Sequence, residues 1–291
     1  MITKLENEYI IATINSFGAE LCSLKLKQDQ TEYIWQADPK YWARHTPVLF
    51  PIVGRLAEDE YLLGDKTYTL PQHGFARDME FDLLIQEKSH VQYRLLSNEQ
   101  TIKNYPNNFE LVLGYTLKDK ELIVEYTVKN RDDKIMYFSL GAHPGFRCPL
   151  LPNECFEDYY LEFSQKETVY RYPLENGLIL NQPEILLNND HIIPLSYDLF
   201  KRDALIFKGL KSNSITLKSK KSNKALMVKF DGFPFHGIWT KPNSNAPFIC
   251  IEPWYGIADA AGRKGQLSDK EGICSLNASE AFSCQFSIMI H

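Results

Sequence analysis

The 291-residue sequence lacks the short motifs that mark nucleotide binding and serine-hydrolase chemistry. It contains neither GxGxxG nor GxxxxGK[ST], the glycine-rich loops that hold phosphates at helix N-termini. It also has no GxSxG pattern, which places a serine nucleophile on a sharp turn. The sequence therefore contains no motif for nucleotide binding or for a serine nucleophile.

The sequence contains cysteines, but their spacing forms no recognised motif. The six cysteines include no CxxC pair. Cys22, Cys250 and Cys284 lie in alternating apolar runs ("AELCSLKL", "FICIE", "FSCQFSI"), where we expect them to be small buried hydrophobic side chains. A catalytic thiol is the alternative, for which the flanking residues give no support.

Concentrated positive charge and long apolar runs are missing as well. The formal net charge is −5 and the Lys and Arg residues are scattered, which argues against a nucleic-acid partner. No apolar run approaches the roughly 18 residues that span a membrane. The N-terminus "MITKLENEYI" has no apolar core of the signal-peptide kind, so we expect a cytoplasmic protein without a membrane partner. The content of 44% hydrophobic and 24% charged residues is that of an ordinary globular protein.

Helical signals are also few, whereas period-two runs recur every eight to fifteen residues, as in "HVQYRLL", "SITLKS" and "AFSCQFSIMI". Residues 111–130 are typical of a hairpin around the polar turn "KDKE". Only residues 38–45, with Pro39 at the first helical position, and 98–105 favour short helices. Because the strand signals do not pause, we predict an all-β fold: one large antiparallel β-sandwich domain over residues 1–291.

Polar side chains stand out at three places in this strand-rich chain. His73 and Arg77 lie in the turn-like segment "LPQHGFARD", and His143 lies between an apolar run and a proline in "GAHPGFR". Glu252 follows "FICI", so we expect it to start deep, at the end of a strand, and to emerge at a rim. Burial would raise its pKa toward neutral pH and make it a usable base. Considered one at a time, His73 could be an ordinary turn histidine, His143 a core histidine and Glu252 a surface glutamate.

The combination of "HGFAR", "HPGF" and "EPW" in one long β-rich chain resembles the aldose 1-epimerase (galactose mutarotase-like) family. The resemblance is strongest to the LacX-type and hexose-6-phosphate mutarotase-like branch, and it extends from "INSFGAELCSLKL" to the last strand. It implies a β-supersandwich fold, which agrees with the strand pattern. The "HGFAR" segment differs from that of the galactose mutarotase branch, so the resemblance does not indicate galactose as the substrate.

The resemblance implies an acid–base pair. His143 matches the general acid that protonates the sugar ring oxygen, and Glu252 matches the general base that takes the proton of the anomeric hydroxyl. An aldopyranose exchanges its α and β forms by opening to the aldehyde, which needs both transfers, and a positioned proton transfer contributes about 10²–10⁴-fold. Histidine suits the acid role because its pKa of about 6.5 lies near neutrality. The reaction requires no metal, nucleotide or other cofactor.

The resemblance also implies four substrate-binding residues. His73 and Arg77 match substrate contacts, Arg55 in "LFPIVGRL" matches a binding arginine, and Asp203 in "KRDALIF" matches an aspartate that binds sugar hydroxyls. Two arginines at one pocket would suit a hexose 6-phosphate. Alternatively, each arginine pairs with a nearby acid or carbonyl, or Arg77 contacts a neutral sugar. The expected partner is a small sugar or sugar phosphate, and the oligomeric state is not indicated.

Three other functions compete with a mutarotase. A glycoside hydrolase normally needs two carboxylates at a defined separation, and the sequence nominates only Glu252 clearly. A non-catalytic carbohydrate-binding protein would have a similar cleft. A metal-dependent isomerase would use His73, His143 and Glu252 as ligands, but the HxH…E clustering of metal-binding β-barrels is absent.

Overall fold

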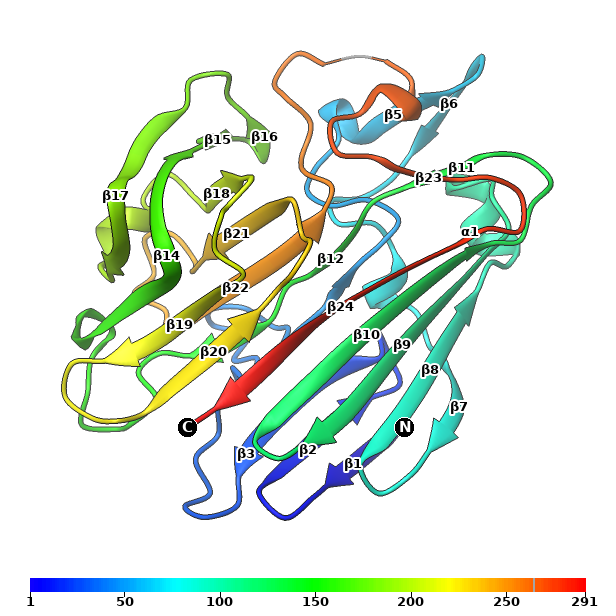
Figure 1. Ribbon diagram of the computed structural model, residues 1–291. Coiled ribbons are helices and arrows are strands. Elements are labelled where there is room, and N and C mark those ends of the chain that lie inside the picture. The colour runs from blue at the N-terminus through cyan, green and yellow to red at the C-terminus, as the bar shows by residue number, and fades with distance from the viewer. Residues whose placement is uncertain (264) are drawn as a thin grey trace.

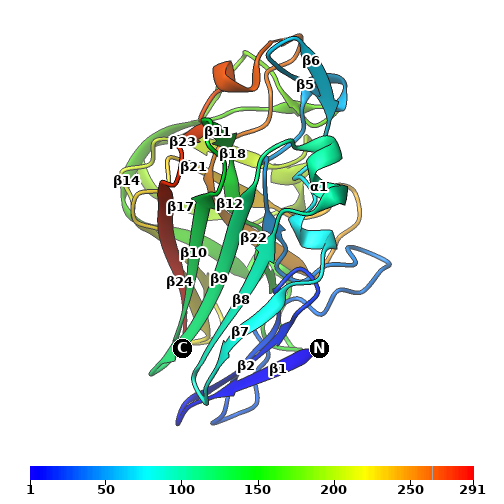
Figure 2. The same ribbon diagram turned by 90° about the vertical axis from the view of Figure 1, so that its right-hand side faces the viewer.

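The computed structural model describes residues 1–263 and 265–291, and antiparallel sheets dominate it (Figure 1). Figure 2 shows the long strands of the largest sheet running side by side. This sheet has nine strands in the order β17 (Glu184–Pro194), β14 (Tyr159–Arg171), β19 (Ser214–Ser219), β20 (Ala225–Lys229), β24 (Ala281–Ile290), β10 (Glu121–Asn130), β9 (Phe109–Lys118), β8 (His90–Leu96) and β7 (Asp82–Gln86).

A second sheet carries Glu252, the predicted base. Its order is β18 (Leu205–Lys208), β21 (Phe235–Trp239), β22 (Phe248–Tyr255), β12 (Leu140–Ala142) and β4 (Val48–Leu49), and β13 (Gly145–Arg147) also pairs with β22. The smaller sheets are β1 (Ile2–Glu6), β2 (Ile10–Asn15) and β3 (Glu20–Leu26); β5 (Glu60–Leu63) with β6 (Lys66–Thr69); β11 (Met136–Phe138) with β23 (Cys274–Leu276); and β15 (Leu174–Glu175) with β16 (Leu178–Ile179).

Alternation along the second sheet divides its side chains between two environments. Ile249 and Ile251 of β22 join the main core, together with residues of β9 and β10. Cys250 and Trp254 instead belong to two smaller clusters on the opposite face. Both faces are buried, which explains why "FICIEPW" is almost continuously apolar. The predicted antiparallel β-sandwich is therefore confirmed, and β22 has a second face available for a site.

Helices are short, as the sequence predicted, but one predicted helix is wrong. Helix α1 (Glu99–Asn104) is confirmed, and the side chain of Asn98 caps it by accepting hydrogen bonds from two backbone N–H groups. Residues 38–45 form only a turn: Trp42 donates its N–H to the carbonyl oxygen of Asp38, but the N–H of His45, which would continue a helix by donating to Tyr41, donates to the side chain of Glu20 instead. Over the described chain, none of the helices has the length and apolar character needed to cross a bilayer.

Candidate active site

A proline interrupts the strand that carries His143. β12 pairs with β22 as far as Gly141, and β13 resumes the pairing at Gly145. His143 and Pro144 lie between the two strands, opposite the middle of β22. Since side chains alternate, Leu140 and Ala142 enter the main core while His143 turns to the other face, toward the pocket.

Glu252 lies inside β22, so our expectation that it ends a strand and emerges at a rim is wrong. The strand continues through Pro253, and Glu252 is only 2% exposed. Ile251 donates its N–H to Pro144 on the side of β12 and β13, and the nitrogen of Pro253 therefore faces the same side. A central strand tolerates proline there because the neighbouring strand is already interrupted. The break between β12 and β13 places His143 beside Glu252.

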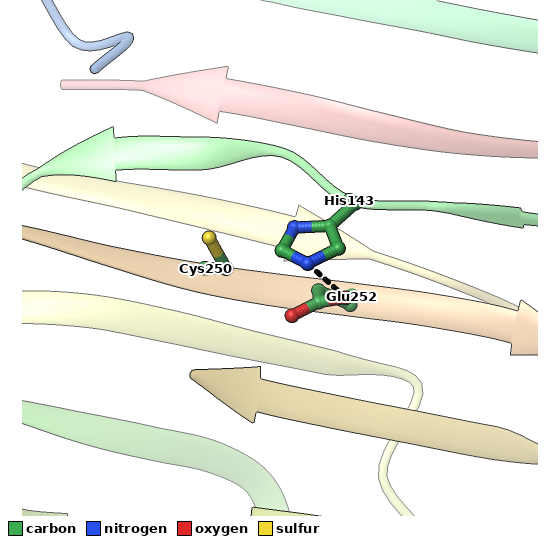
Figure 3. A group of neighbouring side chains, drawn as sticks. All are labelled: His143, Cys250 and Glu252. Atoms are coloured by element: carbon green, nitrogen blue, oxygen red, sulfur yellow. Dashed lines mark ion pairs between the residues drawn. The ribbon is translucent and has the colours of Figure 1, made fainter. Parts of the chain in front are cut away.

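The imidazole and the carboxyl group are in contact. Nε2 of His143 lies 3.2 Å from Oε2 of Glu252 (Figure 3). Both side chains are buried, and neither Oε2 of Glu252 nor Nδ1 of His143 has a hydrogen-bond partner among the described residues. Buried polar atoms without a partner are uncommon in proteins and mark a site where a ligand can supply the missing bonds.

A pocket of about 350 Å³ opens over this pair, a size typical of small-molecule sites. Its apolar wall includes Trp42, Trp239 and Trp254. The ring of Trp42 lies on that of His143, with 4.9 Å between centroids. The polar side chains that line the pocket are Gln72, His73, Arg77, His143, Asp203 and Glu252. The structure thus brings five of the six predicted residues together, all except Arg55.

His73 has a defined tautomer. Gly54 donates its backbone N–H to Nδ1 over 3.2 Å, so Nε2 carries the proton in the neutral ring and can donate a hydrogen bond. Burial lowers the pKa of His73 well below its usual value, and the nearby His143 and Arg77 add to this effect. His73 has a left-handed φ of 69°. Gly74 also has a left-handed φ, of 70°, and a Cβ at Gly74 would lie 2.3 Å from the carbonyl oxygen of Phe50. The "HG" of "HGFAR" therefore fixes a tight turn that holds the imidazole at the pocket.

Asp203 lies on the pocket wall in a strained conformation. Its φ is 68°, in the left-handed region that non-glycine residues seldom adopt, and its Oδ1 accepts a hydrogen bond from the N–H of Ala204. Its carboxylate also contributes to the raised pKa of Glu252. Strain of this kind persists where the surroundings impose it, commonly at functional sites.

Arg77 reaches the pocket with spare hydrogen-bonding capacity. One Nη donates to the carbonyl oxygen of Gln72 over 2.7 Å, while Nε has no hydrogen-bond partner among the described residues and lies 3.7 Å from Asp78. Arg44 holds Asp78 more closely, at 2.8 Å. Burial lowers the pKa of Arg77 to about 10, and the charge of Arg44 adds to this effect. Two arginines thus share Asp78 as an ion-pair partner, and Arg44 is the nearer of the two.

Arg55 is placed differently from the other predicted residues. It forms a two-pronged ion pair with Asp59, with both N–O distances 2.8 Å, and it donates to the carbonyl oxygen of Asn176. In the described chain, it is outside the set of residues that line the pocket. Its side chain packs against Gly177, which does line the pocket. The observed contacts support the loop at residues 176–177.

Burial favours the uncharged form of both catalytic candidates. It raises the pKa of the Glu252 carboxyl well above its usual range, and the Asp203 carboxylate raises it further. It lowers the pKa of His143 to about 3, an effect to which Arg77 and Arg44 contribute. A protonated Glu252 beside a neutral His143 holds the same number of protons as a carboxylate beside an imidazolium. A single proton transfer across the 3.2 Å contact therefore interconverts the two forms.

We expect Glu252→Gln to stabilise the fold increasingly as the pH rises. Above pH 4.5 the carboxyl ionises in the unfolded chain but stays protonated in the folded protein, so rising pH favours unfolding. Glutamine removes this dependence, and the stability difference between variant and wild type should grow by up to about 1.4 kcal/mol per pH unit until the folded pKa is reached. Denaturant unfolding at pH 5 and pH 8 measures it.

The control for this measurement is Glu8→Gln, which removes one acid at an exposed position. Its difference from the wild type should change little between the two pH values. A Glu252→Gln difference that stays constant or shrinks with pH would show that the carboxyl is ionised in the folded protein.

Sequence reasoning missed two kinds of residue at the site. Trp42 and Trp239 come from distant segments, and nothing local marks them as pocket residues. Cys250 was expected to be a small buried hydrophobe, and it is fully buried. Its sulfur nevertheless lies close to both His143 and Glu252. The period of two along "FICIE" was a usable signal, because it puts Cys250 and Glu252 on one face of the strand.

Comparison with known proteins agrees with this site. The family model for aldose 1-epimerase matches residues 1–271. The plasmid-encoded protein LacX of Lactococcus lactis is 39% identical in an alignment of 280 residues that covers 93% of each chain. A galactose mutarotase related enzyme from Lactobacillus acidophilus has a TM-score of 0.96 and 39% identity, over 100% of this chain and 97% of that chain. A galactose mutarotase-like protein from Lactobacillus casei has a TM-score of 0.93 and 34% identity, over 100% of both chains. This chain belongs to the aldose 1-epimerase family, as its three histidine and glutamate motifs indicated.

Proposed function

We propose that the protein is a mutarotase that interconverts the α and β anomers of an aldohexose or a hexose 6-phosphate. The observation that carries the proposal is the buried pair of His143 and Glu252, 3.2 Å apart at a pocket of about 350 Å³. Membership of a family of sugar epimerases supports an isomerase of this type. The tryptophans of the pocket wall suit the apolar face of a sugar ring, and Asp203 and His73 suit its hydroxyl groups.

The pair supplies both proton transfers. In its charged form, the imidazolium of His143 protonates the ring oxygen while the carboxylate of Glu252 takes the proton of the C1 hydroxyl, and the C1–O5 bond breaks. The pair is then neutral and the sugar is an open aldehyde. After rotation about C1–C2, Glu252 returns its proton to the aldehyde oxygen while His143 accepts the proton of the C5 hydroxyl, and the ring closes on the other face. Each turnover restores the charged form.

Burial suits this cycle. The protein holds one proton in the pair over a wide pH range, since the pKa of Glu252 is raised and that of His143 is lowered. Acid and base are thus always present together, whichever atom carries the proton. Ring opening uses the charged form of the pair and ring closure uses the neutral form, so catalysis requires both forms to be accessible.

The arginine end of the pocket favours a phosphorylated sugar. Arg77 has an Nε without a hydrogen-bond partner in the described chain, and Asp78 is held by Arg44. A phosphate can accept charge-assisted hydrogen bonds from such a guanidinium. The overall charge of −5 gives no general attraction for anions, so the preference rests on this local charge.

The test of the proposal is catalysis of anomer exchange. Polarimetry and exchange NMR on pure anomers of aldohexoses and their 6-phosphates should show a first-order rate that rises linearly with protein concentration. The spontaneous rate measured in the same buffer is subtracted. A rate that stays at the spontaneous value for every sugar, together with sugar binding by calorimetry, would instead support a carbohydrate-binding protein.

A hydrolase is tested with the same samples. Asp203 is a second carboxylate at the pocket, as a glycoside hydrolase would need. Release of sugar from a panel of aryl glycosides, with no anomer exchange, would replace the mutarotase assignment. We expect exchange and no hydrolysis, because the group in contact with Glu252 is an imidazole.

A further inference from the structure

A thiol lies next to the acid–base pair. Cys250 and Glu252 are two residues apart on β22, so both side chains leave the same face, and His143 reaches them from the break between β12 and β13 (Figure 3). The sulfur of Cys250, an imidazole nitrogen of His143 and a carboxylate oxygen of Glu252 all lie within 4.8 Å of one another. All three side chains are buried.

We propose that His143, Cys250 and Glu252 form a binding site for a thiophilic divalent metal ion such as Zn²⁺, and that the bound ion blocks the sugar site. Zinc binds sulfur, imidazole nitrogen and carboxylate oxygen at about 2.0–2.3 Å, usually as a tetrahedron. Tetrahedral geometry at these lengths separates the ligand atoms by roughly 3.4–3.7 Å. The His143 and Glu252 atoms are already 3.2 Å apart, and none of the three ligand atoms is more than 4.8 Å from another, so only small side-chain shifts are needed. The fourth position remains for a water molecule.

Charge balance favours an ion at this point. The Cys250 thiol and the Glu252 carboxyl group are both buried, and two uncompensated anions at one buried site would be costly. A dication that displaces both protons gives a neutral cluster of metal, thiolate and carboxylate, with a neutral imidazole as third ligand. The cost of burying the separate charges is then largely removed.

The donor set selects the type of metal. Thiolate and imidazole favour zinc and its neighbours among the transition metals, whereas Mg²⁺ and Ca²⁺ need six or more oxygen ligands. Oε2 of Glu252 and Nδ1 of His143 lack hydrogen-bond partners in the described part of the chain, so lone pairs are available to a metal without breaking existing bonds.

The ion would inhibit anomer exchange, because it occupies the atoms that move the protons. This consequence rests on the proposed function, whereas the metal site itself rests on the geometry alone. Zinc bound to His143 and Glu252 prevents one from donating and the other from accepting a proton. We therefore expect inhibition that a chelator reverses and that saturating sugar opposes.

Direct metal binding tests the site without an activity assay. Zn²⁺ is titrated into the reduced, metal-stripped protein in competition with a chromogenic chelator, and Co²⁺ is added to a second sample to record its sulfur-to-metal charge-transfer band. We expect one tight site per chain in the wild type. Cys250→Ala should weaken it at least about 100-fold and remove the charge-transfer band, since even second-layer changes at metal sites cost about 10–100-fold.

Two controls make the result decisive. Cys155→Ala removes an exposed thiol and should bind zinc like the wild type, and Mg²⁺ should neither bind nor inhibit. If Cys250→Ala does not fold, Cys250→Ser replaces it, and His143→Asn serves as an independent ligand variant. Unchanged affinity in the Cys250 variant, or no stoichiometric site in the wild type, would overturn the proposal. Zinc binding without anomer exchange by the metal-free protein would retain the metal site and reject the mutarotase function.

Discussion

Glu252→Gln and His143→Asn should each lower kcat for anomer exchange by about 10²-fold or more, with a smaller change in KM. Each variant keeps the approximate shape of the side chain but removes one of the two proton transfers, which are made only in the transition state. Because the two groups share one proton across a 3.2 Å contact, the losses should not be additive. Polarimetry at saturating sugar measures kcat for both single variants and the double variant.

The same experiment separates acid–base from metal chemistry. Excess chelator should not reduce the activity of the wild type, since no step in the proposed cycle uses a metal. Activity that a chelator abolishes and zinc restores would reject the acid–base assignment. The matched control is Glu8→Gln, at an exposed position, which should keep wild-type kinetics.

Arg77→Ala should reduce kcat/KM for a hexose 6-phosphate by about 10–150-fold while changing that for the free sugar little. The expected size follows from the loss of a charge-assisted hydrogen bond, worth about 1.5–3 kcal/mol. The guanidinium lines the pocket, and its Nε has no hydrogen-bond partner among the described residues. In the described chain its ion-pair partner is Asp78, which Arg44 holds more closely. Initial rates on the phosphorylated and free forms of one sugar measure the ratio.

A scaffold role for Arg77 gives a different result. Its hydrogen bond to the carbonyl oxygen of Gln72 also shapes the "HGFAR" turn, and loss of that bond would affect both sugars equally. Equal losses, accompanied by a lower melting temperature, would therefore exclude a phosphate contact. Arg94→Ala, on β8 of the nine-stranded sheet, is the control for removal of an arginine that lies outside the pocket lining in the described chain.

The sequence identified the strands because one-sided burial imposes a period of two on each of them. β8, β19 and β24 begin and end at the predicted residues, and the hairpin of β9 and β10 forms as expected. α1 was also predictable, because its capping contacts join residues only two or three positions apart. Interactions between residues so close in the chain can be inferred from a single sequence.

The sequence also nominated the polar residues of the pocket, but only its family motifs could do so. His73, His143 and Glu252 are separated by 70 residues or more, and spacing alone gives no reason for them to meet. What brings the last two together is the interruption at Pro144, which lies opposite β22 only once β12, β13 and β22 are aligned. Strand pairing between distant segments is a property of the assembled sheet.

Tertiary contacts decided the rest, because they outweigh local preference. Residues 38–45 carry a helix signal, yet the side chain of Glu20 accepts the His45 N–H that a helix would use. Arg55 carries a binding motif, yet Asp59 and the carbonyl oxygen of Asn176 hold its guanidinium. The chain by itself thus determined the fold class and the candidate acid and base. Only the folded structure shows how far each of these groups is removed from water, and this burial is what shifts their pKa values.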